Sequence, residues 1–207
     1  MGRYTGPVCR LCRREKQKLF LKGKRCFTEK CALSVKSYPP GKKVRFVRKL
    51  SGYGLRLREK QKARRMYGLM EKQFRLCFDK AERMKGIAGI NFLQLLERRL
   101  DNVVFRIGFA SSRSQARQMV RHGHFLVNGR KVDIPSYSVE VGDEIQPREK
   151  SRELDVIKNV LEEGNEQESA AWIEVDKEQL KAKVLRFPVR EEMPLVQEQL
   201  IVELYSK

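Results

Sequence analysis

The sequence predicts an α+β protein that is mostly helical. It combines a cysteine-rich N-terminal segment and a helical region with a small domain in which helices accompany a β-hairpin or small antiparallel sheet. Four cysteines lie within residues 9–31, helical patterns cover residues 52–68 and 91–100, and an Asn-Gly pair at 128–129 follows a short strand-like alternation. Because the 41% of hydrophobic residues are unevenly spread, we expect small cores rather than a single large one.

The charge of the chain is large and unevenly distributed. The net charge is +19, and the first 50 residues hold 16 Lys and Arg against 2 Asp and Glu, whereas residues 151–207 hold 8 against 13. A basic half of this kind indicates a polyanionic partner, for which nucleic acid is the usual candidate. A membrane surface is the weaker alternative, because no stretch pairs its basic residues with a broad apolar face. No apolar run approaches the roughly 18 residues of a spanning helix, and no signal peptide opens the chain, so we expect a cytoplasmic protein without a membrane partner.

The cysteines of residues 1–45 predict a metal site. Cys9 and Cys12 form a C-x2-C pair, and Cys26 and Cys31 form a C-x4-C pair. Two thiolate pairs joined by a loop can surround one tetrahedral ion, and four protein ligands leave no position for a catalytic water. We expect one structural Zn²⁺. Its binding would stabilise the fold of this segment, which has too few apolar residues to form a core of its own. An iron–sulfur cluster and disulfides are the alternatives that the spacing leaves open.

Basic residues continue from this segment into the next region, 46–97. After the break at Pro39-Pro40-Gly41, the chain has the composition of an arm that becomes ordered on a nucleic-acid surface. Residues 52–68 predict a helix that is cationic all round and repels itself unless phosphates lie alongside; the alternative is a solvated helix between domains. The cations of these regions that we expect to contact RNA are Arg3, Arg10, Arg13, Arg14, Lys22, Lys42, Lys43, Arg45, Arg48, Lys49, Arg56, Arg58, Lys60, Lys62, Arg64 and Arg65.

A second helix is predicted over residues 91–100. Its apolar residues repeat at i, i+3, i+4 and i+8 and are expected to be core; they are Phe92, Leu95, Leu96 and Leu100.

Residues 98–132 predict a short helix, a glycine stop and a hairpin. Ser112 can cap the helix, and Gln115 can complete a capping box. Gly123 suits the left-handed residue that ends a helix, and Asn128-Gly129 is a strong hairpin signal. Arginines at 113, 117 and 121 share one arc of the helix, which gives either a phosphate-binding platform or an ordinary solvated face. The expected RNA contacts here are Arg113, Arg117, Arg121, His122, His124, Asn128, Arg130 and Lys131.

The acidic end of the chain is expected to stay away from phosphate. Residues 151–161 predict a helix, and residues 162–207 are expected to pack on the helical region or to meet a basic neighbour. The alternation of Leu200, Val202 and Leu204 predicts a short strand or an extended tail.

Enzyme classes find little support. The chain has only two histidines, His122 and His124, and their neighbours offer no nucleophile with an orienting acid. The glycine spacings of a nucleotide phosphate loop and of a dinucleotide-binding loop are both incomplete. No pair of carboxylates has an arrangement that suggests general acid–base catalysis. We therefore expect a binding protein with no catalytic residues and no small-molecule substrate.

The chain resembles the bacterial family of small-subunit ribosomal protein four. The resemblance is carried by MGRYTGPVCRLCRRE, LREKQKARRMYG, RLDNVVFRIGFASSRSQARQMVRHGHFLVNGRKVDIPSY and EQLIVELYSK, which together sample nearly the whole length. The chain departs from the family pattern at Lys42-Lys43-Val44 and at Gly52.

The resemblance implies an "S-four"-type RNA-binding domain at 98–161, beside a helical domain formed by both flanking regions. It further implies direct binding to small-subunit (16S) ribosomal RNA, a role in nucleating assembly of the subunit body, and contact with small-subunit ribosomal protein five. A position along the channel through which mRNA enters follows from the same resemblance. The alternative function is a zinc-dependent nucleic-acid-binding regulator or an RNA chaperone outside the ribosome.

Overall fold

The chain forms two compact units in the computed structural model, which describes residues 2–41, 49–154, 157, 170–176 and 178–206. Met1–Phe92 and Leu195–Lys207 make up the first unit, and Leu93–Pro194 the second. This division differs from the expected boundaries, because the acidic segment 162–207 contributes to both units. Two of its strands complete the sheet of the second unit, and the residues from Leu195 onward belong to the first unit.

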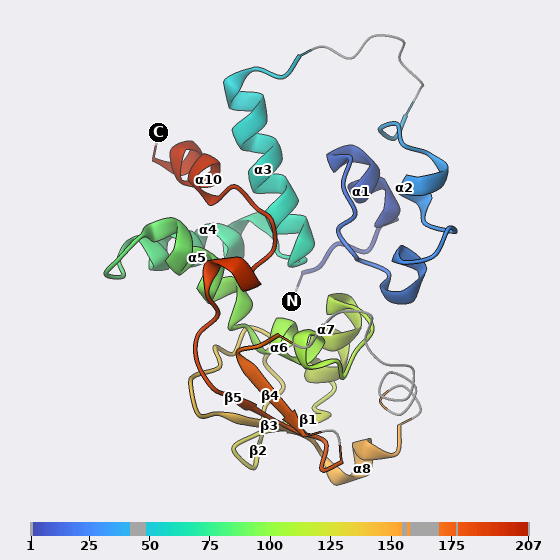
Figure 1. Cartoon of the computed structure of the whole chain (residues 1–207), viewed down its shortest axis with the longest axis vertical. Helices are drawn as coiled ribbons and strands as arrows, with labels where there is room; N and C mark the ends of the chain where they lie inside the picture. The colour runs from blue at the N-terminus through green and yellow to red at the C-terminus, as the bar shows by residue number, and fades with distance from the viewer. Residues whose placement is uncertain (1, 42–48, 155–156, 158–169, 177, 207) are drawn as a thin grey trace. The chain divides into compact units, whose positions relative to one another are not determined.

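The first unit is helical (Figure 1). Its elements are α1 (Cys9–Glu15), the 3-10 helix η1 (Gly23–Cys26), α2 (Ala32–Val35), α3 (Gly52–Met66), α4 (Glu71–Glu82), the first part of α5 (Ala88–Glu97) and α10 (Glu198–Tyr205). The predicted helix over 52–68 is confirmed, and it begins where the Ser51 hydroxyl accepts a hydrogen bond from the Gly54 amide. Phe74 and Phe92 meet edge to face in the core, with ring centroids 4.9 Å apart.

The C-terminal residues form helix α10, so the predicted strand or extended tail is wrong. The side chains that make the packing contacts are four residues apart rather than two. Ile201 is fully buried, and the Tyr205 ring lies 4.8 Å from that of Phe78, centroid to centroid. Helical spacing brings both to one face. That face packs against α3, beside which α10 lies in Figure 1.

The predicted helix over 91–100 divides into two. Its four apolar residues are buried as expected, but α5 ends at Glu97, and α6 (Leu100–Ile107) starts after an extended Arg99. The amide of Leu100 donates to the Tyr137 carbonyl, a contact 37 positions away that local spacing does not reveal. Tertiary pairing therefore overrides a continuous helical pattern here.

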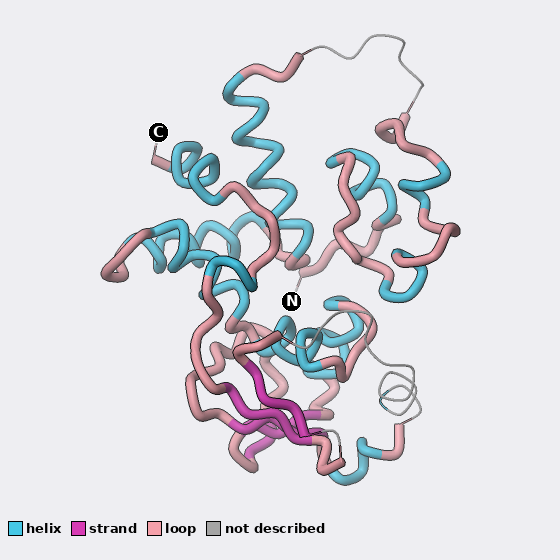
Figure 2. Tube along the Cα trace, in the orientation of Figure 1, coloured by secondary structure: helices cyan, strands magenta, loops and turns pink. Residues whose placement is uncertain are grey.

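The second unit places helices against a five-stranded antiparallel sheet (Figure 2). Its elements are the end of α5, α6, α7 (Arg113–Arg121), β1 (Phe125–Val127), β2 (Arg130–Lys131), β3 (Glu144–Pro147), α8 (Glu149–Arg152), β4 (Ile173–Asp176), β5 (Lys181–Val184) and the 3-10 helix η2 (Arg190–Glu192). The strand order is β2-β1-β3-β5-β4; the predicted hairpin is β1 and β2, and the three strands that widen the sheet were not predicted. Of the predicted helix over 151–161, α8 covers the start, and most of the remainder lies outside the described residues.

One apolar core fills the space between the helices and the sheet of the second unit. It is formed by side chains from α6, α7 and the strands, among them Val104, Phe109, Val120, Phe125 and Ile145, all fully buried. Trp172, at the start of β4, adds the largest side chain to it. This core fixes the arginine helix α7 against the hairpin.

Candidate nucleic-acid interface

Helix α7 begins and ends as the sequence predicts, with one difference in its cap. The Ser112 hydroxyl accepts a hydrogen bond from the Gln115 amide, and Gly123 ends the helix with a φ of 73°. The Gln115 side chain accepts from the amide and hydroxyl of Ser111 instead of the Ser112 amide. The second hydrogen bond of the predicted capping box, which the Gln115 side chain accepts, therefore comes from Ser111 rather than from the N-cap residue Ser112.

The three arginines of α7 differ in exposure, which corrects the idea of one free cationic face. Arg121 is exposed, whereas Arg117 is buried and its Nε lies 3.1 Å from a carboxylate oxygen of Asp101. Arg113 is half-buried; its Nε donates to the Asn102 side chain at 2.7 Å, and its guanidinium lies 4.5 Å from the Phe105 ring centroid. Two of the three arginines thus hold the fold together, and Arg121 is the one presented to a ligand.

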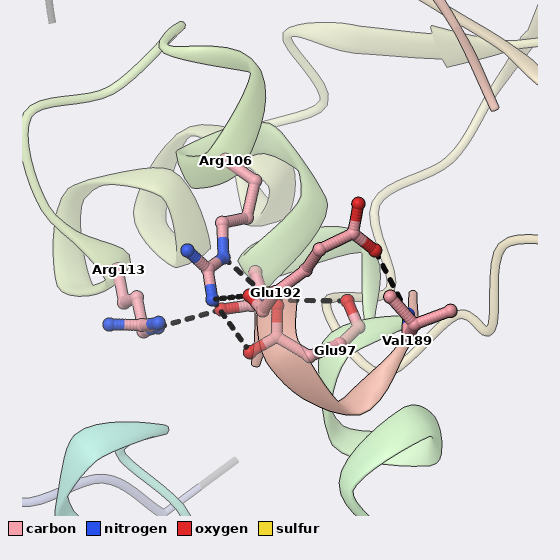
Figure 3. Close-up of polar contacts among 6 residues, drawn as sticks. Glu97, Arg106, Arg113, Val189 and Glu192 are labelled. Atoms are coloured by element: carbon pink, nitrogen blue, oxygen red, sulfur yellow. Dashed lines mark hydrogen bonds and ion pairs between the residues drawn. The ribbon is translucent and has the colours of Figure 1, made fainter. Parts of the chain in front are cut away.

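A buried polar network between the end of α5 and α6 fixes the Asn102 side chain that Arg113 contacts, because Asn102 donates to the Glu97 carboxylate at 2.9 Å. Glu97 is fully buried, and its two carboxylate oxygens accept from Nε and Nη2 of Arg106 at 2.9 and 3.2 Å. The Arg106 guanidinium also reaches the backbone carbonyl of Glu192 in η2, whose side chain accepts from the Val189 amide (Figure 3). Buried charges require such partners. Sequence reasoning missed this network, because its members come from segments almost 100 residues apart.

The hairpin turn matches the prediction. Asn128 and Gly129 both have positive φ values, 49° and 74°, as a type I′ turn requires. The Asn128 side chain accepts from the Glu144 amide and donates to Asp143, so its first role is to tie the turn to β3. Arg130 and Lys131 on β2 are exposed and remain available for phosphate.

The two histidines lie at the junction of α7 and β1. His122 is exposed, whereas the Nδ1 of His124 lies 3.0 Å from the Ser151 hydroxyl of α8. Burial, with smaller contributions from His122 and Arg148, lowers the pKa of His124. His124 is therefore held by the fold, and His122 is the more accessible of the pair.

The cations of helix α3 form ion pairs within the first unit, which corrects the expectation that only phosphates could relieve their repulsion. All six predicted RNA contacts on α3 form ion pairs: Arg56 with Glu203, Arg58 and Arg65 with Glu15, Lys60 and Arg64 with Glu71, and Lys62 with Glu59. Four carboxylates from α1, α3, α4 and α10 thus converge on one helix.

The four carboxylates differ in how deeply they are buried. The Glu15 side chain is 2% exposed, and burial raises its pKa although Arg58 and Arg65 act to lower it. Burial acts to raise the pKa of Glu71, but hydrogen bonds from Lys60 and Tyr205 lower it overall. Glu71 is 44% exposed but is held by Lys60, Arg64 and Tyr205, whereas Glu203, 39% exposed, pairs with Arg56; Glu203 is therefore more easily displaced by another anion than Glu71.

The N-terminal cations are mostly exposed. Arg3, Arg10, Arg14, Lys22 and Lys49 are at the surface. Arg13 instead closes the segment on itself: its Nε donates to the Tyr38 carbonyl at 3.0 Å, and its guanidinium lies over the Tyr38 ring. The expected contacts Lys42, Lys43, Arg45 and Arg48 lie outside the described residues.

The four cysteines of the N-terminal segment are close enough to influence one another. Cys12, Cys26 and Cys31 are buried. Burial raises the pKa of the Cys12 thiol, and the other three thiols add to the rise. Four thiols have the donor chemistry of a tetrahedral site. Among the described residues, however, no three or more His, Cys, Asp or Glu side chains are grouped as ligands of one ion. The metal remains a prediction.

Sequence reasoning also missed exposed cations near the α7 platform. Arg148 and Lys150, at the start of α8, are exposed, and the Arg148 amide donates to the His124 carbonyl. Arg148 is thereby brought to the end of α7. Only the sheet register reveals this, since β3 pairs with β1 and carries residues 148–150 back to the histidines.

Within the described part of the chain, no helix is long and apolar enough to cross a membrane.

Comparison with known proteins adds two domain matches and full-length relatives. Residues 3–97 match the "Ribosomal protein S4/S9 N-terminal domain", and residues 98–145 match the "S4 domain". The chain is 59% identical over 208 residues to "Small ribosomal subunit protein uS4" of Thermodesulfovibrio yellowstonii and 58% identical to that of Pelobacter propionicus. The protein of the same name from a Thermoanaerobacter species is 57% identical. Each alignment covers 100% of both chains.

Proposed function

The chain belongs to the family of small ribosomal subunit protein uS4, and on this basis we propose that it is a structural constituent of the small ribosomal subunit that binds the subunit's ribosomal RNA directly. The full-length identity of 59% is the observation that carries the proposal. It supports a structural role, in the cytoplasmic small subunit, over an enzymatic one.

The geometry supports two different roles for the cations: exposed ones contact RNA, and buried ones stabilise the fold. In the second unit the exposed cations Arg121, Arg130, Lys131, Arg148 and Lys150 meet phosphate, while Arg113 and Arg117 brace α7. Broad phosphate contact of this kind suits folded RNA, which proteins recognise through shape and backbone. In the first unit the exposed N-terminal cations supply the contacts, and α3, whose cations are paired with carboxylates, serves chiefly as a support.

Three finer parts of the proposal are carried by the family resemblance. They are nucleation of the subunit body during assembly, contact with small-subunit ribosomal protein five, and a position along the channel through which mRNA enters. Reconstitution of the small subunit with and without the chain tests the first. Crosslinking within the assembled subunit tests the other two.

Binding to small-subunit ribosomal RNA as a function of salt tests the proposed function, with transfer RNA and duplex DNA as competitors. Tight binding that survives near-physiological salt and excess competitor is the expected result, because recognition of RNA shape adds to phosphate neutralisation. Binding that weakens equally for all three, with a steep salt slope, would favour the regulator or RNA chaperone outside the ribosome.

We further propose that Cys9, Cys12, Cys26 and Cys31 bind one structural Zn²⁺. Their spacing, their donor chemistry and the burial of three of them support this proposal. Elemental analysis of freshly purified protein should give one zinc per chain. Cys77→Ser, which changes the one cysteine of the sequence outside the two pairs, is the control that retains the zinc, and Cys26→Ser should lose it. Iron and visible absorption would indicate an iron–sulfur cluster, and metal-free protein with titratable thiols would refute the site.

A further inference from the structure

A stacked pair of aromatic rings lies in the cysteine-rich segment: Phe20 stands between the two cysteine pairs, and Phe27 stands inside the second pair, directly after Cys26. The centroids of Phe20 and Phe27 are 4.9 Å apart, and their planes are inclined by 29°. Phe27 keeps 37% of its surface exposed, although Leu19 in the same segment is fully buried. The rings therefore form an apolar surface that the local core leaves accessible.

The backbone holds both rings in place. Phe20 has a φ of 50°, a left-handed conformation that residues other than glycine seldom adopt. Phe27 directly follows η1, and its amide donates to the Lys24 carbonyl at 3.0 Å. The Lys22 amide donates to the Cys26 sulfur at 3.3 Å and fixes the same turn. Backbone strain of this kind persists where the surroundings enforce it, and it is concentrated at binding sites.

The surroundings of the rings are cationic. Glu29 is the only carboxylate in the sequence between Lys16 and Lys30. The exposed cations that flank the rings are Lys22, Lys24, Arg25 and Lys30. An exposed aromatic ring among cations is the combination by which proteins bind unpaired nucleotides: the base stacks on the ring, and the cations attract the phosphates.

We propose that Phe20 and Phe27 form a stacking platform for an unpaired nucleobase of RNA. The base stacks on Phe27, Phe20 supports that ring from within the same segment, and the flanking cations hold the adjacent phosphates. This inference rests on the proposed RNA-binding function and deepens it, because it adds a contact that depends on an unpaired base rather than on charge.

Replacement of Phe27 by alanine tests the platform in the full-length chain. We expect Phe27→Ala to weaken binding to small-subunit ribosomal RNA roughly five- to hundredfold, the range for loss of one stacked base. The slope of affinity against salt should not change, because no charge is removed. Phe187→Ala is the matched control, because Phe187 of the second unit is 39% exposed. Thermal unfolding and thiol titration establish that the segment remains folded.

A tryptophan reporter tests the stacking itself. The native chain has a single tryptophan, Trp172, which is 1% exposed, so its emission provides the background. Phe27→Trp should retain RNA binding, and its added emission should be strongly quenched on titration with small-subunit ribosomal RNA, because a base stacks on the indole.

The outcomes separate this inference from the proposed function. If the native chain shows no preference for small-subunit ribosomal RNA over transfer RNA, the proposed function fails. If that preference holds, the platform is refuted by Phe27→Ala binding like Phe187→Ala, by a shallower salt slope, or by an unquenched reporter.

Discussion

A carboxylate oxygen of Asp101 lies 3.1 Å from Nε of Arg117, and the same carboxylate accepts two hydrogen bonds from Arg99 at 3.2 Å. Asp101 is 4% exposed and Arg117 is 9% exposed, so this pair is part of the interior. The link joins the start of α6 to the middle of α7. The sequence pattern treats every arginine of α7 as available to RNA. Because Asp101 holds Arg117 in the interior, α7 is cationic but not all of its arginines can contact RNA.

Arg117→Met should therefore destabilise the second unit. The variant leaves Asp101 buried with Arg99 as its remaining partner, and we expect the free energy of unfolding to fall by about 1–3 kcal/mol. Urea unfolding of the variant and the native chain measures the change. An unchanged midpoint and slope would show that the pair contributes nothing to stability.

Arg121→Glu should have the opposite effect: it should weaken RNA binding and leave the stability of the fold nearly unchanged. Because Arg121 is exposed, we expect stability to change by less than about 0.5 kcal/mol. Affinity for small-subunit ribosomal RNA should fall about tenfold or more, and the salt slope should decrease by about one. Lys183→Glu, at an exposed position of β5, makes the same change in net charge and is the control. Equal losses for both variants would mean that only overall charge matters.

The sequence predicted the local features of α7 and the hairpin because the signals are local. Ser112, Gly123 and Asn128-Gly129 act on their own neighbours, and each takes the expected role. The exposure of the arginines depends on partners from other segments. No spacing within 113–121 indicates that Asp101 and Asn102 hold two of the three.

The same reasoning explains the errors in the helical unit. Arg56 and Glu203 are 147 positions apart and Arg58 and Glu15 are 43 apart, so these ion pairs of α3 have no local pattern. The C-terminal alternation was misinterpreted because leucines and valines occupy both faces of α10, and packing selects the face that carries Ile201. The sheet is larger than the sequence predicts because β4 and β5 are short, and β5 pairs with β3, which lies far from it in the sequence.

Glu203→Gln should increase RNA affinity. The Arg56–Glu203 pair is partly exposed, so its loss should cost less than about 1 kcal/mol of stability. The released Arg56 can then pair with phosphate, and we expect binding about two- to fivefold tighter at low salt. Glu82→Gln removes one exposed carboxylate of the same unit and controls for net charge. If both variants gain equally, Glu203 has no special role as a competitor.

The stability of the second unit should decrease in mild acid through His124. Burial lowers the pKa of His124 in the folded chain, with His122 and Arg148 as further causes. The unfolded chain therefore takes up the proton first, and the stability that is present above about pH 6.5 is lost as the pH falls through the lower folded pKa.

Thermal midpoints of the native chain and of His124→Gln, measured between pH 8 and 5, test this dependence. The variant should show a smaller decrease with acid. His122→Gln should reduce the decrease only in part, since His122 is the secondary cause. Parallel curves for the native chain and His124→Gln would refute the assignment.

The first unit is assembled from both ends of the chain, because α10 packs on α3 while Leu93–Pro194 forms a unit of its own. Protein synthesis runs from the N-terminus, so α3 emerges more than 130 residues before the helix that covers it. Until then the apolar side of α3 lacks its cover, and Arg56 lacks Glu203. A chain interrupted after Pro194 but before α10 therefore carries a complete second unit and a first unit that lacks its last helix. Such a chain differs from the complete one in both exposed apolar surface and charge, the features by which chaperones and proteases distinguish unfinished proteins.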